Sequence, residues 1–214
     1  MALTLSAVTC LDEMKCGYRP IAENDGRQAL ERAQAAVRIN ESSDYAQVVL
    51  SQVCFDAFAD YDEAIAAAKR SLEINPIYTL GTHYLGLAKI CSGDLEDGLA
   101  LCLDAAATSP RTMVVNHWYL QSVALGELAL GRYDAAVDAA SRSDQVQTDV
   151  ARTLLLWSSA AGLAGDMEAA HKAAERLLTL QPDFRIRDFG NWPFRERETA
   201  ERLVEGLRLS GLPQ

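Results

Sequence analysis

A short helical pattern recurs along this chain, and the spacing of its copies constrains the fold more than any other feature. The copies begin near residues 59, 92, 130 and 164. Gly131 and Gly165 are 34 residues apart, whereas the step from Gly93 to Gly131 is 38 and predicts four extra residues in the loop around 111–116 or in the helix after it. A repeated unit of this size is typical of folds in which each unit packs only against its neighbours. We therefore expect one elongated stack of helices.

Each copy combines residues that end one helix, begin the next and let the two approach closely. A glycine or another small residue can end the first helix in a left-handed conformation, and Asp94 or Asp166 can cap the second. Small side chains then recur at helical spacing along the second helix, in the sets Ala64, Ala68 and Ser71; Gly98, Cys102 and Ala105; Ala136, Ala140 and Ser143; and Ala170, Ala174 and Leu177. This stripe predicts closely packed helix pairs.

The pattern resembles the tetratricopeptide repeat, a helix-turn-helix unit of about 34 residues. The segment YLGLAKICSG (84–93) keeps the first-helix signature of that family, whereas Ser51 and Gln52 stand where Leu and Gly are usual. A fifth, degenerate unit is expected at the N-terminus, with its first helix near 2–17 and its second over 23–40.

The resemblance implies an all-α fold, a right-handed superhelix of antiparallel helix pairs that forms a solenoid. It places residues 1–182 in the repeat stack and residues 183–214 in a C-terminal capping segment. A capping helix over about Glu196–Leu209 should shield the last repeat, with Leu203, Val204, Leu207 and Leu209 turned toward it.

A second resemblance lies in the segment PDFRIRDFGNWPFRERETAERLVEGLRLSGLP (182–213). It is similar to the end of the repeat regions that follow class III adenylate cyclase or winged-helix domains in bacterial regulators. The residues that match are Phe184, Pro193, Phe194, Glu205, Gly206, Leu207, Arg208, Gly211, Leu212 and Pro213. A generic capping helix is the other interpretation of this segment.

Two functions follow from these resemblances. The first is a non-catalytic interaction or scaffolding module, the repeat region of a bacterial signalling or transcriptional regulator. The alternative is a structural self-association or connector element of an adenylate cyclase-like protein. This chain shows neither strand-like alternation nor a basic recognition helix, so we expect the cyclase or DNA-binding domain to be absent from it.

The family resemblance also implies a concave groove lined by the first helix of each pair. The groove residues that we expect to bind a partner are Val49, Val53, His83, Leu87, Ile90, Trp118, Gln121, Leu125, Leu128, Arg152 and Leu155. The other groove positions are Ala46, Asp56, Ala57, Leu80, Cys91, Ala129, Ser159, Gly162 and Leu163. Most are apolar, which suits an amphipathic helix of a protein or peptide partner, a neighbouring segment of the same chain, or self-association. In the competing interpretation, tight coiling of the stack buries these side chains.

Composition and motifs argue against other functions. The formal charge of −10 disfavours nucleic acid. The opening residues reach Asp12 and Glu13 too early for a signal peptide or a membrane span. Five cysteines without a Cys-x-x-Cys pair favour a reducing, cytoplasmic location. No motif indicates a metal, a cofactor or a catalytic site, so we expect no enzyme activity.

The far-ultraviolet circular dichroism spectrum should be dominated by helix, because every periodic segment repeats near 3.6 residues. A substantial sheet signal would contradict the predicted fold.

Overall fold

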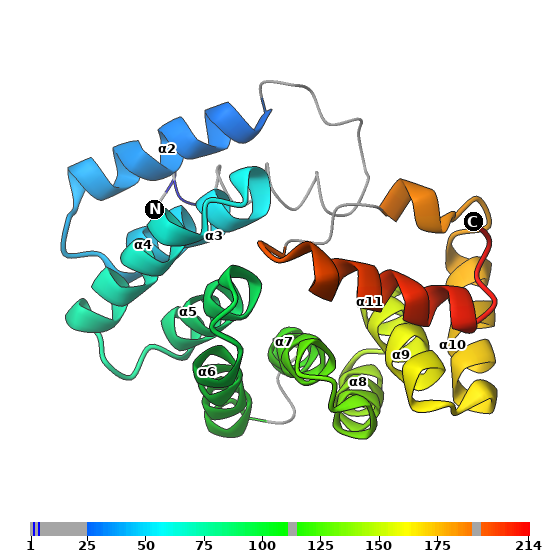
Figure 1. Ribbon diagram of the computed structural model, residues 1–214. Helices are drawn as coiled ribbons and strands as arrows, with labels where there is room; N and C mark the ends of the chain where they lie inside the picture. The colour runs from blue at the N-terminus through cyan, green and yellow to red at the C-terminus, as the bar shows by residue number, and fades with distance from the viewer. Residues whose placement is uncertain (1, 3, 5–24, 111–114, 190–193) are drawn as a thin grey trace. The chain divides into compact units, whose positions relative to one another are not determined.

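The structure is a computed structural model that describes residues 2, 4, 25–110, 115–189 and 194–214 (Figure 1). Over these residues the regular elements are all helices and no strand is present, so the predicted all-α fold is confirmed. The chain divides into two compact units, Met1–Lys89 and Ile90–Gln214. The C-terminal segment therefore shares a compact unit with the last repeats.

The first unit is built from α2 (Asp25–Ile39), α3 (Asp44–Phe58), α4 (Tyr61–Ile74) and most of α5 (Thr79–Ser92). Helix α3 packs between α2 and α4, and Gly81 of α5 lies close to Leu72 of α4. Helix α2 is the second helix expected for the degenerate N-terminal unit. The first helix expected near 2–17 lies outside the described residues, apart from Ala2 and Thr4.

The second unit contains the end of α5 followed by seven further elements. These are α6 (Leu95–Thr108), α7 (Asn116–Ala129), α8 (Tyr133–Val146), α9 (Ala151–Ala164), α10 (Met167–Leu180), the short 3-10 helix η1 (Ile186–Phe189) and α11 (Arg197–Leu209). From α6 to α10 each helix packs against the next, and α7 also contacts α9. Short connections join α7 to α8 and α9 to α10, which makes each of these a helix hairpin.

The 38-residue step from Gly93 to Gly131 owes its extra length to two connections between helices. The connection from α6 to α7 has seven residues, whereas the equivalent connection from α8 to α9 has four. The connection from α7 to α8 has three residues, whereas the one from α9 to α10 has two. The differences of three residues and one residue together give the four extra residues that the glycine spacing predicted.

Left-handed residues end the first helices, as predicted. Gly93, Gly131 and Gly165 have φ values of 107°, 76° and 83°. In the first unit the same place is taken by Ala59, with φ 51°. A residue with a Cβ is disfavoured in this conformation, so Ala59 holds a strained turn that glycine relieves in the later repeats.

Capping of the second helices is confirmed in part. The side chain of Asp166 accepts a hydrogen bond from the backbone N–H of Ala169 at 3.0 Å. Asp94 occupies the N-cap position of α6 but makes no side-chain cap hydrogen bond, so its predicted capping role is wrong.

The small-residue stripe is buried in every second helix. All twelve stripe residues named from the sequence are completely or almost completely buried from solvent. Ser51, which replaces the usual leucine, donates a hydrogen bond from its hydroxyl to the carbonyl of Ala64 at 2.8 Å. The substitution is therefore accommodated by a polar contact between α3 and α4.

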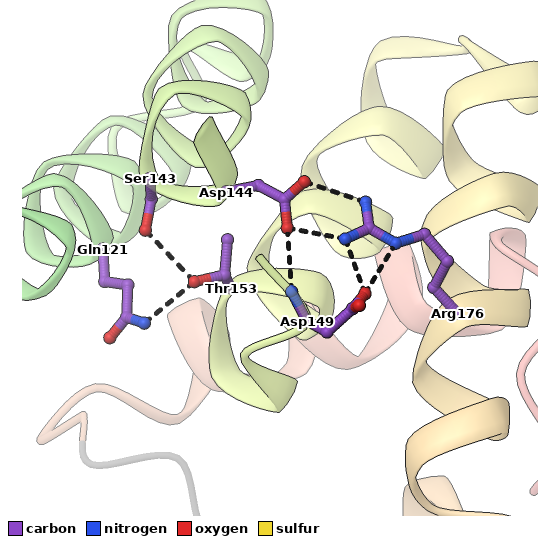
Figure 2. A network of polar contacts seen from close by, with 6 residues as sticks. All are labelled: Gln121, Ser143, Asp144, Asp149, Thr153 and Arg176. Atoms are coloured by element: carbon purple, nitrogen blue, oxygen red, sulfur yellow. Dashed lines mark hydrogen bonds and ion pairs between the residues drawn. The ribbon is translucent and has the colours of Figure 1, made fainter. Parts of the chain in front are cut away.

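A directed chain of buried hydrogen bonds joins α7, α8 and α9 (Figure 2). The amide of Gln121 donates to Thr153 Oγ1 at 2.9 Å, and the hydroxyls of Thr153 and Ser143 lie 3.1 Å apart. Ser143 donates to the carbonyl of His117 at 3.1 Å, so Thr153 must be the donor to Ser143. Each hydroxyl donates once and accepts once, and the chain fixes the register of two neighbouring repeats.

A second polar cluster holds the turn between α8 and α9 against α10 (Figure 2). The guanidinium of Arg176 binds both carboxylate oxygens of Asp144, at 2.7 and 2.9 Å, and also the carboxylate of Asp149. Asp149 has φ 57°, and its backbone N–H donates to Asp144. The bidentate geometry makes this a directional contact, and it supports a turn whose backbone is strained.

Thr153→Val should lower the free energy of unfolding by about 1–3 kcal/mol, because the isosteric change leaves the buried amide of Gln121 without its acceptor and Ser143 without its donor, although Ser143 keeps the carbonyl of His117. Urea denaturation measures the difference. Thr179→Val is the matched control, since exposed Thr179 bonds only within α10 and its loss should cost about 0.5 kcal/mol or less. Equal losses for the two variants would show that the buried chain contributes nothing.

Candidate functional site

The C-terminal helix α11 packs across the ends of the first helices rather than following α10 as the next member of the stack. Its main helix neighbours are α9 and, more weakly, α7 (Figure 1). The residues Ala129, Ser159 and Gly162 contact α11, and Cys91 contacts Arg195 just before it; we call these four the α11-binding face. All four were assigned to the groove from the sequence, and here a segment of the same chain covers them.

Two glycines set the distance between α9 and α11. A Cβ at position 206 would meet the carbonyl oxygen of Ser159 well inside van der Waals contact. A Cβ at Gly162 would lie 2.5 Å from the carbonyl oxygen of Gly206. Any larger side chain at either position would force the two backbones apart. Interior glycines cost about 1 kcal/mol relative to alanine in a helix, so a close approach accounts for their presence.

Polar contacts attach the segment to the C-terminal ends of α5 and α7 and to the C-terminal half of α9. The backbone N–H of Arg195 donates to the carbonyl of Cys91 in α5 at 2.8 Å. The guanidinium of Arg202 donates to the carbonyl of Ala129 in α7 at 3.2 Å. The hydroxyl of Ser159 in α9 donates to the carbonyl of Leu203 at 2.8 Å. The last carbonyls of a helix lack partners within it, and a cation there interacts favourably with the helix dipole.

One apolar edge of α11 is buried against this face. Leu203 and Leu207 are fully buried, which agrees with their predicted orientation, and Val204 is partly buried. Leu209 keeps 44% of its surface exposed, although its Cβ lies close to Gly162 of α9. The helix shields the first helix of the last pair, and only the tail after it approaches α10, where Gly211 lies near His171.

Most of the eleven residues expected to bind a partner are buried in the structure. The buried ones are Val49, Val53, His83, Leu87, Ile90, Gln121, Leu125, Leu128 and Leu155. Ile90 lies against Gly126 of α7, and Gln121 is engaged in the hydrogen-bond chain with Thr153. These two residues make contacts between repeats, of the kind that the competing interpretation of the sequence expected.

Two of the eleven reach the surface. Trp118 is 46% exposed, and it is the one exposed residue of α7, whose other members are buried or nearly so. Arg152, at the equivalent position one repeat later in α9, is partly exposed. Both lie in the first turn of their helices, whereas α11 covers the last turns. The first-helix surface is therefore closed at one end and accessible at the other.

The part of the chain that the structure describes offers little for chemistry. Cys54 and Cys102 are buried, and burial, aided by Glu63 and Asp60, raises the pKa of the Cys54 thiol to about 12. Such a thiol stays protonated near neutral pH and is a poor nucleophile. No group of three His, Cys, Asp or Glu residues in the described ranges could hold a metal ion. None of the helices described has the length and apolar character needed to cross a bilayer.

A hollow of about 360 Å³ lies between η1 and α11. It is lined by Ile186, Arg187, Val204, Arg208 and Gln214. This lining contains no nucleophile and no paired acid and base.

The sequence matches no protein-family model and no curated protein. The structure is similar to that of PilW, described as a widely conserved type IV pilus biogenesis factor, at 16% identity and a TM-score of 0.67 over 98% of this chain and 90% of that one. It is also similar to pilF of Pseudomonas aeruginosa, at 14% identity and a TM-score of 0.66 over 94% and 89% of the two chains. YrrB, described as a tetratricopeptide repeat protein with an unusual peptide-binding site, aligns at 15% identity and a TM-score of 0.55 over 75% and 80%. The fold is thus that of tetratricopeptide repeat proteins.

Ending the chain at Phe194 should lower the melting temperature by on the order of 10 °C, because burial of Leu203 and Leu207 is worth about 1.5–3 kcal/mol each. The uncovered face should also promote aggregation. Thermal unfolding by circular dichroism and light scattering measure the two effects. A shortened chain as stable and as soluble as the full one would show that α11 shields nothing.

Proposed function

We propose that this chain is a non-catalytic protein-interaction module whose first helices receive an amphipathic helix of a protein or peptide partner. The proposal also places it in the cytoplasm, as the repeat region of a bacterial signalling or transcriptional regulator. Repeat stacks of this fold have no central cavity, and their extended surfaces suit protein partners.

The exposed Trp118 is the observation that carries the proposal. Twelve of the fourteen residues of α7 are buried, yet Trp118 in its first turn is 46% exposed. Exposed tryptophans are frequent among the residues that dominate protein interfaces. Arg152 lies one repeat further along at the same position, so it can pair with an acidic group of a partner that contacts Trp118.

The amphipathic helix is favoured over other partners because the C-terminal parts of the same first helices already bind one. Helix α11 buries Leu203 and Leu207 there and exposes charged residues on its opposite side. A helix bound in a groove is recognised through apolar residues at this spacing.

The regulator context rests on the resemblance of residues 182–213 to the end of regulator repeat regions. The structure gives part of this segment a packing role, since Gly206 lies against Ser159, Leu212 is buried and Gly211 has φ 81°. A generic cap therefore accounts for the same residues. A cyclase or winged-helix domain encoded upstream in the same reading frame would support the regulator, and a pilus or secretion gene neighbourhood would oppose it.

Trp118→Ala should abolish association while changing the melting temperature by only a few degrees, because nearly half of the side chain is already in water. Cross-linking through a photoreactive residue at position 118 in host cells, together with analytical ultracentrifugation, measures association with a partner or with a second copy. Thermal unfolding of the same protein measures stability.

Leu103 provides the matched control, since it is 45% exposed but lies on α6, a second helix. Leu103→Ala and a cross-linker at 103 should leave association unchanged and capture no specific protein. A loss of about 3–5 kcal/mol in Trp118→Ala would make Trp118 a core residue and refute its binding role. Association unaffected by the substitution would refute it equally, and capture of a second copy would favour the self-association alternative.

A further inference from the structure

We propose that α11 is a built-in occupant of a helix-binding face, and that a partner helix of the same pattern binds by replacing it. The proposal rests on the function proposed above, since it assumes that the first helices receive a partner. The surface is the α11-binding face, and the helix that fits it is amphipathic.

The position of α11 distinguishes it from a repeat helix. Each helix from α6 to α9 packs against its successor, but α10 is not among the helices against which α11 packs. Instead α11 packs across α9 and the end of α7, through Ser159 and Ala129, and Arg195 just before it binds the carbonyl of Cys91 near the end of α5. A helix that crosses several units in this way has the geometry of a ligand bound to the stack.

The interface defines the pattern that a replacement must carry. Thr199, Leu203, Gly206 and Leu207 are the buried residues of α11, and they recur at helical spacing along one edge. The leucines fill the apolar contacts, and Gly206 is required because a Cβ there would meet the backbone of Ser159. The fitting ligand is therefore an amphipathic helix with Leu-x-x-Gly-Leu on its apolar edge.

The ion pairs of α11 lie within the helix and do not involve the stack. Its ion pairs Arg197–Glu201, Arg202–Glu198 and Arg208–Glu205 join residues three or four apart within the helix. Such pairs support an isolated helix and survive its release. Helix α9 loses one neighbour when α11 leaves but keeps α7, α8 and α10, so the repeats retain most of their packing.

Release of α11 can be tested with Gly206→Ala in the full chain. The added methyl group should separate α11 from Ser159, while the gain in helix propensity leaves α11 helical. Glu205→Ala is the matched control, because Glu205 is exposed on the same helix and its substitution adds no contact with α9. The probe is a fluorescein-labelled peptide with the sequence of residues 195–214, and anisotropy measures its binding.

We expect Gly206→Ala to bind this peptide at least tenfold more tightly than the wild-type chain or Glu205→Ala, whose own α11 competes at an effective concentration near the millimolar range. A peptide that itself carries Gly206→Ala should bind at least tenfold more weakly. Hydrogen exchange on the wild-type chain adds a measurement without substitution, in which the amides of α11 should exchange at least tenfold faster than those of α9.

Three results would overturn the proposal. In the first, a folded Gly206→Ala chain binds no peptide or binds it no better than wild type. In the second, Gly206→Ala loses the helicity of the repeats, which would make α11 an inseparable part of the core. In the third, the amides of α11 and α9 exchange together. If the peptide binds as expected but Trp118→Ala does not change association, only the interface role proposed for Trp118 is removed. If Trp118→Ala abolishes association but the peptide does not bind, only the role of α11 is removed.

Discussion

Close approach of helix backbones is the constraint on which this structure depends. Each second helix places alanine, glycine, serine or cysteine where it meets a first helix, and these side chains are almost completely buried. Short side chains let many backbone and Cβ atoms come into contact, so a chain with few aromatic residues still packs densely. A larger residue at Ala64 or Ala136 would displace a whole helix, because the neighbouring repeat leaves no space for it.

The same constraint acts where α11 meets α9, with glycine on both sides of the contact. At the repeat interfaces hydroxyl groups supply the specificity that small apolar residues lack, as in the chain from Gln121 to His117. At the α11 interface Ser159 has the corresponding role, since its hydroxyl binds the carbonyl of Leu203. Both contacts combine close backbones with a buried hydroxyl, although one joins repeats and the other joins a repeat to the C-terminal helix.

Local patterns in the sequence predicted the helices, the left-handed glycines and the buried stripe, since each depends on residues within one repeat. The neighbours of a first helix depend on residues far away in the chain. The sequence therefore showed that Leu125 and Leu128 are apolar but not that they are buried. It also did not show that Gln121 links α7 to α9 through Thr153. Glycines inside two helices, Gly162 and Gly206, were the signal that could have revealed the α9–α11 contact.

The two ends of the first helices have different roles for a physical reason. Their last turns carry carbonyl groups without helical partners, and Arg195 and Arg202 bind two of these, so a segment with donors binds there readily. Their first turns offer Trp118 and Arg152, a flat apolar surface and a cation, to a partner with an apolar edge and an acidic group. A helix that binds across both ends must displace α11 at one of them, whereas a partner limited to Trp118 and Arg152 need not. Affinity that depends on position 206 therefore identifies the first kind of partner, and affinity that depends on position 118 alone identifies the second.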